Sequence, residues 1–163
     1  MRSQHARIQL IAMIFGLVGG LSASVWAQNP AQVGTWKLNL AKSKLPSGQA
    51  PRSVVLKIEA TGMMATTTVD AVGPDGASSH WAFTGAYVGK DVPLSGNNPF
   101  GYETASRKRI SATTTETTYK KGGMVLGVTT SVLSSDGKTL TITAKSTDEQ
   151  GRPVSNVQVY DKQ

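Results

Sequence analysis

The sequence predicts an all-β fold, a single antiparallel β-barrel in which successive strands run up and down. Threonine, valine, serine and glycine dominate the chain after residue 30, and threonine and valine favour pleated strands. Turn sequences, such as Gly-Pro-Asp-Gly at 73–76 and Ser-Asp-Gly-Lys at 135–138, separate about nine or ten short segments. Parallel α/β folds are excluded because no long crossover helix is predicted. We expect an up-and-down barrel of about 8–10 strands, with a β-sandwich as the alternative.

The first 27 residues have the charge and hydropathy order of a cleaved secretory signal peptide. Arg2 and Arg7 precede an apolar run at 8–21, and small residues lead up to Ala27. A membrane anchor is the alternative, but a run of about 14 residues is shorter than the ~20 that a spanning helix needs. We expect cleavage near Ala27, which leaves one domain at 28–163 without a stable membrane anchor.

Composition indicates the compartment of the mature domain. The chain has no cysteine, so it must be stable without disulfides, and a lipid-anchored cysteine is excluded. An exported protein of this kind fits the bacterial periplasm or exterior better than a disulfide-rich secreted module. Without Arg2 and Arg7 the expected mature domain has 15 basic and 10 acidic side chains, a net charge of +5, which favours anionic surfaces or ligands only mildly; scattered solvated lysines are the simpler explanation.

Each strand is expected from its own pattern. Val54, Leu56 and Ile58 alternate with their neighbours at 53–60, and Leu140 and Ile142 do so at 139–146, which predicts strands with one buried face. The other strands are expected at 33–38, 63–72, 77–85, 103–110, 111–121, 124–134 and 154–162. One helical turn is expected at 41–45, and a turn and a loop at 87–102.

The opening Gly34-Thr-Trp36-Lys-Leu resembles the Gly-x-Trp signature of lipocalins and the first strand of fatty-acid-binding proteins. The resemblance implies that Trp36 plugs one end of the barrel and that Gly34 lets the backbone bend there. In fatty-acid-binding proteins an arginine two residues before a C-terminal tyrosine holds a carboxylate; here Gln158 precedes Tyr160. With its closing Val-Tyr-Asp-Lys, the chain more closely resembles uncharacterised exported bacterial proteins of lipocalin-like type, which carry no established activity.

This fold indicates a non-enzymatic binding protein that holds a small hydrophobic or amphipathic ligand inside the barrel. Polar and aromatic side chains would fix the orientation of the ligand, and the candidate binding residues are Trp81, Tyr87, Tyr102, Arg107 and Arg109. The alternative is a barrel filled by its own side chains that serves as an envelope structural or interaction module. An enzyme is the third hypothesis; a carboxylate beside His80 in a cleft would favour it.

The basic run at 107–109 allows two orientations. Arg107 and Arg109 share one face of a strand and Lys108 takes the other. Either face could point inward and meet an anionic head group, or the run could be a solvated outer row. Met63, Met64 and Met124 are expected on strands, either in the core or lining a pocket.

Other ligand classes lack support in the sequence. His80 is the one histidine of the expected mature domain, and a usual zinc site needs three or four ligands, so no metal site is expected. No cofactor is expected either, although one histidine suffices as the axial ligand of a haem. Nucleic-acid binding is not expected because the chain is poor in aromatic residues and shows no stacking platform.

Overall fold

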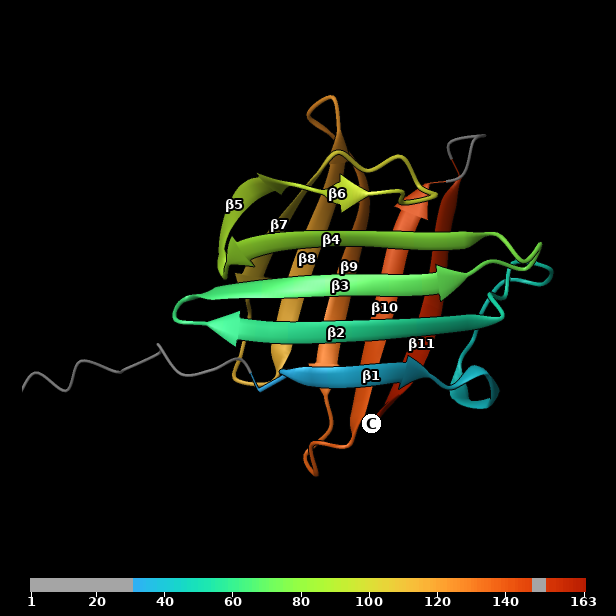
Figure 1. Cartoon of the computed structure of the whole chain (residues 1–163), viewed down its shortest axis with the longest axis horizontal. Helices are drawn as coiled ribbons and strands as arrows, with labels where there is room; N and C mark the ends of the chain where they lie inside the picture. Colours follow the sequence, from blue (N-terminus) through green and yellow to red (C-terminus); the bar gives the residue numbers. More distant parts are fainter. Residues whose placement is uncertain (1–30, 148–151) are drawn as a thin grey trace, which may run out of the picture.

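The computed structural model describes residues 31–147 and 152–163, and most of this part is β-strand (Figure 1). The strands are β1 (Gly34–Leu38), β2 (Ser53–Thr61), β3 (Met64–Val72), β4 (Ser78–Ala86), β5 (Val88–Pro93), β6 (Ser95–Gly96), β7 (Thr104–Arg109), β8 (Thr114–Lys121), β9 (Met124–Leu133), β10 (Thr139–Thr147) and β11 (Pro153–Lys162). A 3-10 turn, η1 (Leu40–Lys42), follows β1, where the sequence predicted a helical turn at 41–45. The signal peptide predicted at 1–27 lies outside the described residues.

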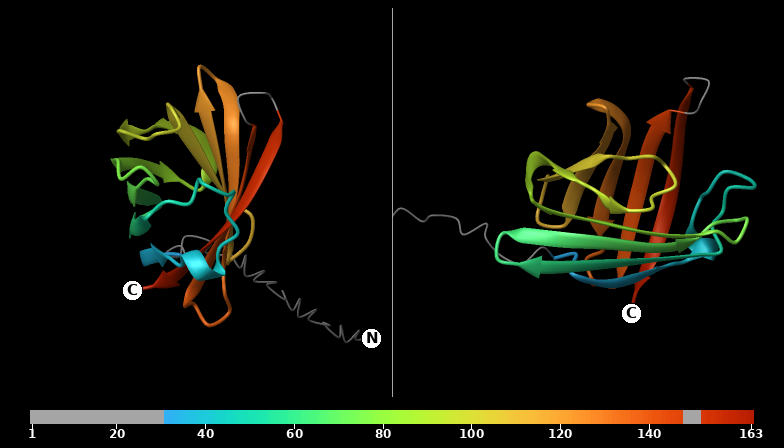
Figure 2. Two further views of the ribbon diagram at one scale, coloured as in Figure 1. Left: turned by 90° about the vertical axis from the view of Figure 1, so that its right-hand side faces the viewer. Right: turned by 45° about the horizontal axis from the view of Figure 1, so that its top comes forward.

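All eleven strands form one antiparallel sheet that nearly closes into a barrel, which confirms the predicted fold class. The strand order is β5-β7-β8-β9-β10-β11-β1-β2-β3-β4-β6, so the first strand lies beside the last. The sheet folds over itself in two layers, with β1–β4 crossing the direction of β8–β11 (Figure 1 and Figure 2). The strand number exceeds the expected 8–10 because the segment after β4 contains two short strands, β5 and β6.

The up-and-down order breaks at one seam. β5 follows β4 in the chain but pairs with β7, while β6 returns to pair with β4 through Trp81 and Ala82. Two sheet edges therefore face each other between β4 and β5. The Val92 side chain packs against Gly85 across this seam, where a Cβ on Gly85 would come within 3.3 Å of it. Because Gly85 has no side chain, β5 can pack closely against β4, and the barrel wall closes there without a ladder of backbone hydrogen bonds between these two strands.

Trp36 on β1 is held in the core by burial and by a hydrogen bond. Its ring is fully buried, and its Nε1–H donates to the carbonyl oxygen of Gln32 at 2.9 Å. The buried amide of Gln32 in turn donates to the carbonyls of Thr113 and Ser131. Gly34 has φ +143°, and a Cβ there would meet the Lys162 side chain at 3.0 Å. In the Gly-x-Trp pair, Gly34 therefore supplies a backbone bend and Trp36 supplies a buried, hydrogen-bonded ring.

The methionine predictions are wrong in part: Met64 and Met124 lie on strands, as expected, but none of the three side chains is in the core. Met63 and Met124 are 76% and 68% exposed, and Met64 is also exposed. Met63 belongs to the turn between β2 and β3, while Met64 and Met124 begin strands directly after the Gly62 and Gly123 turns. All three side chains lie in or directly beside a turn and are exposed, so these thioethers contribute neither to the core nor to an internal pocket. None of the described residues forms a helix long and apolar enough to cross a membrane.

Candidate functional site

Strand alternation sends one row of side chains from each strand into the barrel. β4 contributes Trp81 and Phe83, β7 contributes Arg107, and β8 contributes Tyr119, all of them buried. Buried threonines complete the polar part of the interior: Thr67, Thr115 and Thr117. The inward face is thus apolar and aromatic near β4 and polar near β7 and β8.

Arg107 is the charged group of this interior. It is 4% exposed, and its guanidinium donates to the hydroxyl of Thr67 and, at 3.4 Å, to the carbonyl oxygen of Ala65. Its Cζ lies 4.6 Å from the centre of the Phe83 ring and 5.0 Å from that of Tyr87. Among the described residues, no carboxylate forms an ion pair with Arg107. The outer-row alternative for Arg107 is therefore wrong, and Lys108 takes the exposed face.

Aromatic rings form a continuous chain beside this guanidinium. Trp81 and Phe83 both meet Tyr119 edge-on, with centroid distances of 5.9 and 6.2 Å. Tyr102 stacks on Tyr119 at 4.7 Å, and the exposed Phe100 stacks on Tyr102 at 5.3 Å. The loop before β7 therefore adds the rings of Phe100 and Tyr102 to the aromatic cluster that begins inside the barrel.

The loop that carries Tyr102 is held in place by its own hydrogen bonds. The Asn98 side chain accepts from the Tyr102 N–H and donates to its carbonyl, both at 2.8 Å. The Glu103 carboxylate accepts the N–H of Gly122 in the turn between β8 and β9. The position of Tyr102 is therefore fixed from both sides.

The five candidate binding residues come together in the structure. Trp81 and Arg107 are buried, while Tyr87, Tyr102 and Arg109 are half-buried. The Tyr87 ring contacts both guanidiniums, with its centre 5.0 Å from Cζ of Arg107 and 4.9 Å from Cζ of Arg109.

Two residues that the sequence reasoning did not single out link this group. Phe83 contacts both Trp81 and Arg107, and Tyr119 contacts both Trp81 and Tyr102. Phe83 stands two residues after Trp81, so strand alternation would have put both on one face. Tyr119 follows Thr115 and Thr117 at the same spacing, but an alternation of threonines marks no buried face.

Burial sets the protonation state of the phenols. It raises the pKa of Tyr119 to about 12, although the positive charge of Arg107 opposes this shift. Burial also raises the pKa of Tyr102. Both hydroxyls are neutral at physiological pH and can either donate or accept a hydrogen bond, but they cannot supply the anion that Arg107 lacks.

A second polar row lies on β11. Tyr160 is buried, and its hydroxyl donates to Oε1 of Gln158 at 2.6 Å. The Gln158 amide then donates to Asn156 at 3.1 Å. This chain of neutral groups offers hydrogen bonds without charge, so the cationic position of the described interior is on β7.

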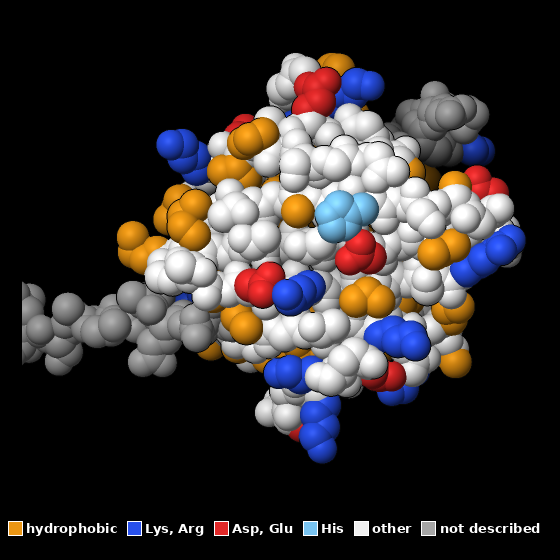
Figure 3. Space-filling view, in the orientation of Figure 1, with side chains coloured by type: hydrophobic (Ala, Val, Ile, Leu, Met, Phe, Trp, Pro, Cys, Tyr) orange, Lys and Arg blue, Asp and Glu red, His pale blue; other side chains and the backbone are white. Residues whose placement is uncertain are grey.

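The outer face of β2–β4 carries a different arrangement. His80 on β4 and Asp70 on β3 are directly opposite each other, with Nδ1 and Oδ1 2.6 Å apart. They line a shallow hollow of about 360 Å³ together with Ser53, Val55, Ala71, Val72, Ser78, Ser79 and Asn97. Figure 3 shows the imidazole beside an acidic side chain on this open face. Asp70 can hold the Nδ1–H and leave Nε2 as an acceptor, but both side chains are well exposed and no hydroxyl bonds to the imidazole among the described residues.

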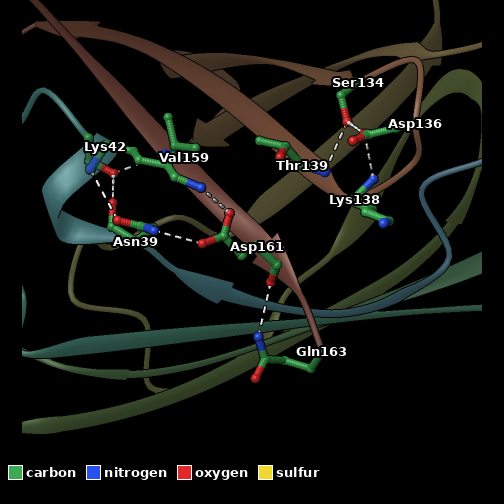
Figure 4. A network of polar contacts seen from close by, with 10 residues as sticks. Asn39, Lys42, Ser134, Asp136, Lys138, Thr139, Val159, Asp161 and Gln163 are labelled. Atoms are coloured by element: carbon green, nitrogen blue, oxygen red, sulfur yellow. Dashed lines mark hydrogen bonds and ion pairs between the residues drawn. The ribbon is translucent and has the colours of Figure 1, made fainter.

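The polar network around the C-terminal strand is structural (Figure 4). The Asp161 carboxylate accepts from the Asn39 amide at 2.6 Å and from Lys42 at 2.9 Å, which ties η1 to β11. These contacts lower the pKa of Asp161. In the nearby hairpin between β9 and β10, Asp136 accepts from Ser134 and from the Lys138 N–H, which also lowers its pKa. Each carboxylate stabilises a chain turn and faces no internal space.

Metal ligation has no support within the described part of the chain. Residues 31–147 and 152–163 contain no group of three or more His, Cys, Asp or Glu side chains placed to hold a metal ion. In comparisons with known proteins, no family model matches the chain, and no curated protein matches it.

Proposed function

We propose that this chain is an exported, non-enzymatic carrier that holds a small amphipathic molecule inside its barrel, with the anionic group of that molecule on Arg107. The signal-like N-terminus supports a periplasmic or secreted location. The lipocalin-like opening and the barrel agree with an internal binding site. The aromatic rings beside Arg107 supply the apolar contact that such a ligand needs.

One observation carries the proposal: Arg107 is buried without an ion-pair partner among the described residues. A buried charge costs several kcal/mol unless an opposite charge and hydrogen bonds offset the loss of water. Thr67 and Ala65 satisfy part of the guanidinium, and the rings of Phe83 and Tyr87 contribute cation–π attraction. A carboxylate, sulfonate or phosphate would supply the missing charge with the fork geometry that arginine favours.

The second candidate is the filled barrel that acts as an interaction module. It is favoured by the close ring contacts around Tyr119, which leave the aromatic interior packed. In this case the guanidinium is satisfied by its internal contacts alone, and its role is to hold β3 and β7 together. The two candidates differ in whether an anion ever reaches Arg107.

Native mass spectrometry of the protein purified from its own host separates them. The carrier shows an added mass that disappears after denaturing extraction, and the released molecule carries an acidic group. A clean apo mass, with no shift after the host's lipid and metabolite extract is added back, overturns the carrier.

Matched variants assign the bound mass to the interior. Arg107→Met should lose the acidic ligand, whereas Lys108→Gln, which removes a neighbouring charge on the outer face, should retain it. Equal retention by both variants would remove Arg107 from the site. Circular dichroism confirms that each variant keeps its strands.

A further inference from the structure

Tyr102 fills a flat space beside the aromatic interior. Its ring stacks on Tyr119, with the ring centroids 4.7 Å apart and the planes inclined by 16°. The tip of the ring lies over Gly127, where an added Cβ would come within 3.1 Å of the Tyr102 hydroxyl. Gly127 stands opposite Tyr119 in the β8–β9 ladder, so its missing side chain leaves room there for a ring. We call the space bounded by the Tyr119 ring and Gly127 the ring slot.

Tyr102 belongs to a loop, whereas the rings that it packs against belong to strands. The Trp81 and Phe83 rings on β4 and the Tyr119 ring on β8 are buried. Tyr102 precedes β7 and is half-buried. Its two hydrogen bonds with Asn98 involve its backbone N–H and carbonyl and not its ring. The ring can therefore turn out of the ring slot about its own side-chain bonds while the loop keeps these hydrogen bonds.

The ring slot lies beside Arg107. In the β7–β8 ladder Tyr119 pairs with Ala105, and Arg107 is two residues further along the same face of β7. Diagonal neighbours in such a ladder are about 7–8 Å apart. Phe83 contacts both residues, with its ring centre 4.6 Å from Cζ of Arg107 and 6.2 Å from the centre of the Tyr119 ring. A ring that stacks on Tyr119 would therefore bring an acid group attached to it towards the guanidinium.

The packing around Tyr119 favours a flat ligand over a flexible chain. The close ring contacts mean that any ligand has to displace a side chain before it reaches Arg107. A long alkyl chain would have to displace buried side chains of the strands, whereas a flat ring displaces Tyr102 and reproduces its stacking. Stacked rings also attract each other beyond the apolar area that they bury, and a rigid ring loses fewer internal rotations on binding.

We propose that the ligand of this barrel is a planar aromatic anion, whose ring replaces Tyr102 on Tyr119 and whose acid group binds Arg107. This inference rests on the proposed function and narrows its ligand to aromatic carboxylates, sulfonates or phosphates, which suit the fork geometry of arginine. It also changes the role of Tyr102 among the predicted binding residues. The Tyr102 side chain holds the ring slot closed in the ligand-free protein and competes with the ligand for Tyr119.

The test is isothermal titration calorimetry of the purified protein with two carboxylates of similar size, the aromatic 2-naphthoate and the aliphatic octanoate. We expect the natural protein to bind 2-naphthoate about tenfold more tightly than octanoate, because octanoate cannot stack and loses more rotational freedom. Arg107→Met should weaken the binding of 2-naphthoate about 10- to 100-fold.

A substitution of Tyr102 tests the displacement itself. Tyr102→Ala empties the ring slot in advance and should bind 2-naphthoate about tenfold more tightly than the natural protein, because no side chain has to leave. The matched control is Phe100→Ala, which removes an exposed ring of the same loop and leaves the ring slot filled; its affinity should stay within about twofold of the natural protein. Tyr102→Ala/Gly127→Val refills the ring slot from β9 and should abolish the gain.

Failure of this inference differs from failure of the carrier. A clean apo mass from the host, together with no binding of either probe, overturns the carrier and the ring slot with it. A bound host acid without an aromatic ring, or octanoate binding as tight as that of 2-naphthoate, overturns the aromatic class and leaves the carrier standing. Unchanged or weaker binding of 2-naphthoate by Tyr102→Ala, or an equal gain in Phe100→Ala, overturns the displacement. The comparison of the two probes needs no variant, so it decides the ligand class even where a substitution prevents folding.

Discussion

Replacement of Arg107 by methionine tests the proposed site most directly. Methionine keeps an unbranched apolar stem in the barrel and removes the guanidinium. A hydrogen bond to a charged group contributes about 1.5–3 kcal/mol, and 1.4 kcal/mol corresponds to a tenfold change in affinity. An anionic amphipathic probe should therefore bind Arg107→Met about 10- to 100-fold more weakly than the natural protein.

The same substitution should change the stability of the ligand-free protein only modestly, in a direction set by two opposing contributions. It removes two charge-assisted hydrogen bonds and two ring contacts and leaves the Thr67 hydroxyl without its donor, but it also relieves a desolvated charge. These terms are each a few kcal/mol and of opposite sign, so the free energy of unfolding should shift by no more than about 2 kcal/mol. A group retained for binding loses probe affinity when it is replaced, while the ligand-free protein stays folded.

The assay is a fluorescence titration with 8-anilinonaphthalene-1-sulfonate beside urea denaturation of the same samples. Lys108→Gln controls for the loss of one positive charge, and we expect it to bind the probe like the natural protein. Probe affinity of Arg107→Met within about twofold of the natural protein would refute the anion site, since one lost charge-assisted hydrogen bond predicts more. Destabilisation by more than about 4 kcal/mol would assign Arg107 a structural role instead.

Three further substitutions test the barrel itself. Trp36→Phe should lower the free energy of unfolding by about 2–4 kcal/mol, because it opens a cavity and leaves the Gln32 carbonyl without its donor. Urea denaturation measures this loss. A loss below about 1 kcal/mol would contradict the role of Trp36 as a buried, hydrogen-bonded anchor. Gly96→Ala should detach β6 from β4, because the residue has φ +92° and its new Cβ would lie 2.1 Å from the His80 carbonyl oxygen. Hydrogen exchange of the β4 amides should then become faster. Unchanged protection of these amides would contradict the steric clash. The Asp161 carboxylate has a lowered pKa in the folded state, so its stabilisation is present above its ordinary value of 3.8 and is lost as the pH falls through the folded pKa. Asp161→Asn should therefore flatten the decline of stability in acid, and an unchanged pH profile would show that the contacts with η1 contribute nothing.

The part of the fold that follows from local pattern was predictable. β10 alternates Leu140 and Ile142 with threonines, and its strand lies where the alternation places it. The Asp-Gly hairpin before it and the Lys-Gly-Gly turn after β8 are also at their expected positions. In these segments the local preference and the barrel require the same conformation.

The orientation of β7 was not predictable from its own residues. Thr104–Arg109 offers Ala105 as its one apolar side chain, which is too small to mark the buried face. The neighbouring β8 decides the orientation, because its pairing places Ala105 opposite Tyr119 and Arg107 opposite Thr117. Whether Arg107 points into or out of the barrel is therefore decided by the pairing of β7 with β8, and it cannot be derived from the residues of β7 alone.

The seam and the exposure of Met63 and Met64 were missed for a related reason. β5 and β6 are short, and their partners, β7 and β4, are set by closure of the barrel. Met63 and Met64 were expected inside since methionine is an apolar residue, yet the Gly62 turn determines their exposure. Where a turn or a long-range pairing decides which way a side chain points, hydropathy alone is insufficient.

The pairing of β1 with β11 has a consequence for the order in which this chain folds. Asn39 and Asp161, which join the two strands, are 122 positions apart in the sequence. Until the last ten residues have been synthesised, β1 pairs with β2 alone and is a sheet edge. Closure of such distant ends pays its entropic cost late and slows folding. The sheet of an incomplete chain therefore stays open along β1, and the two ends of the sheet sequence join only when the final strand is present.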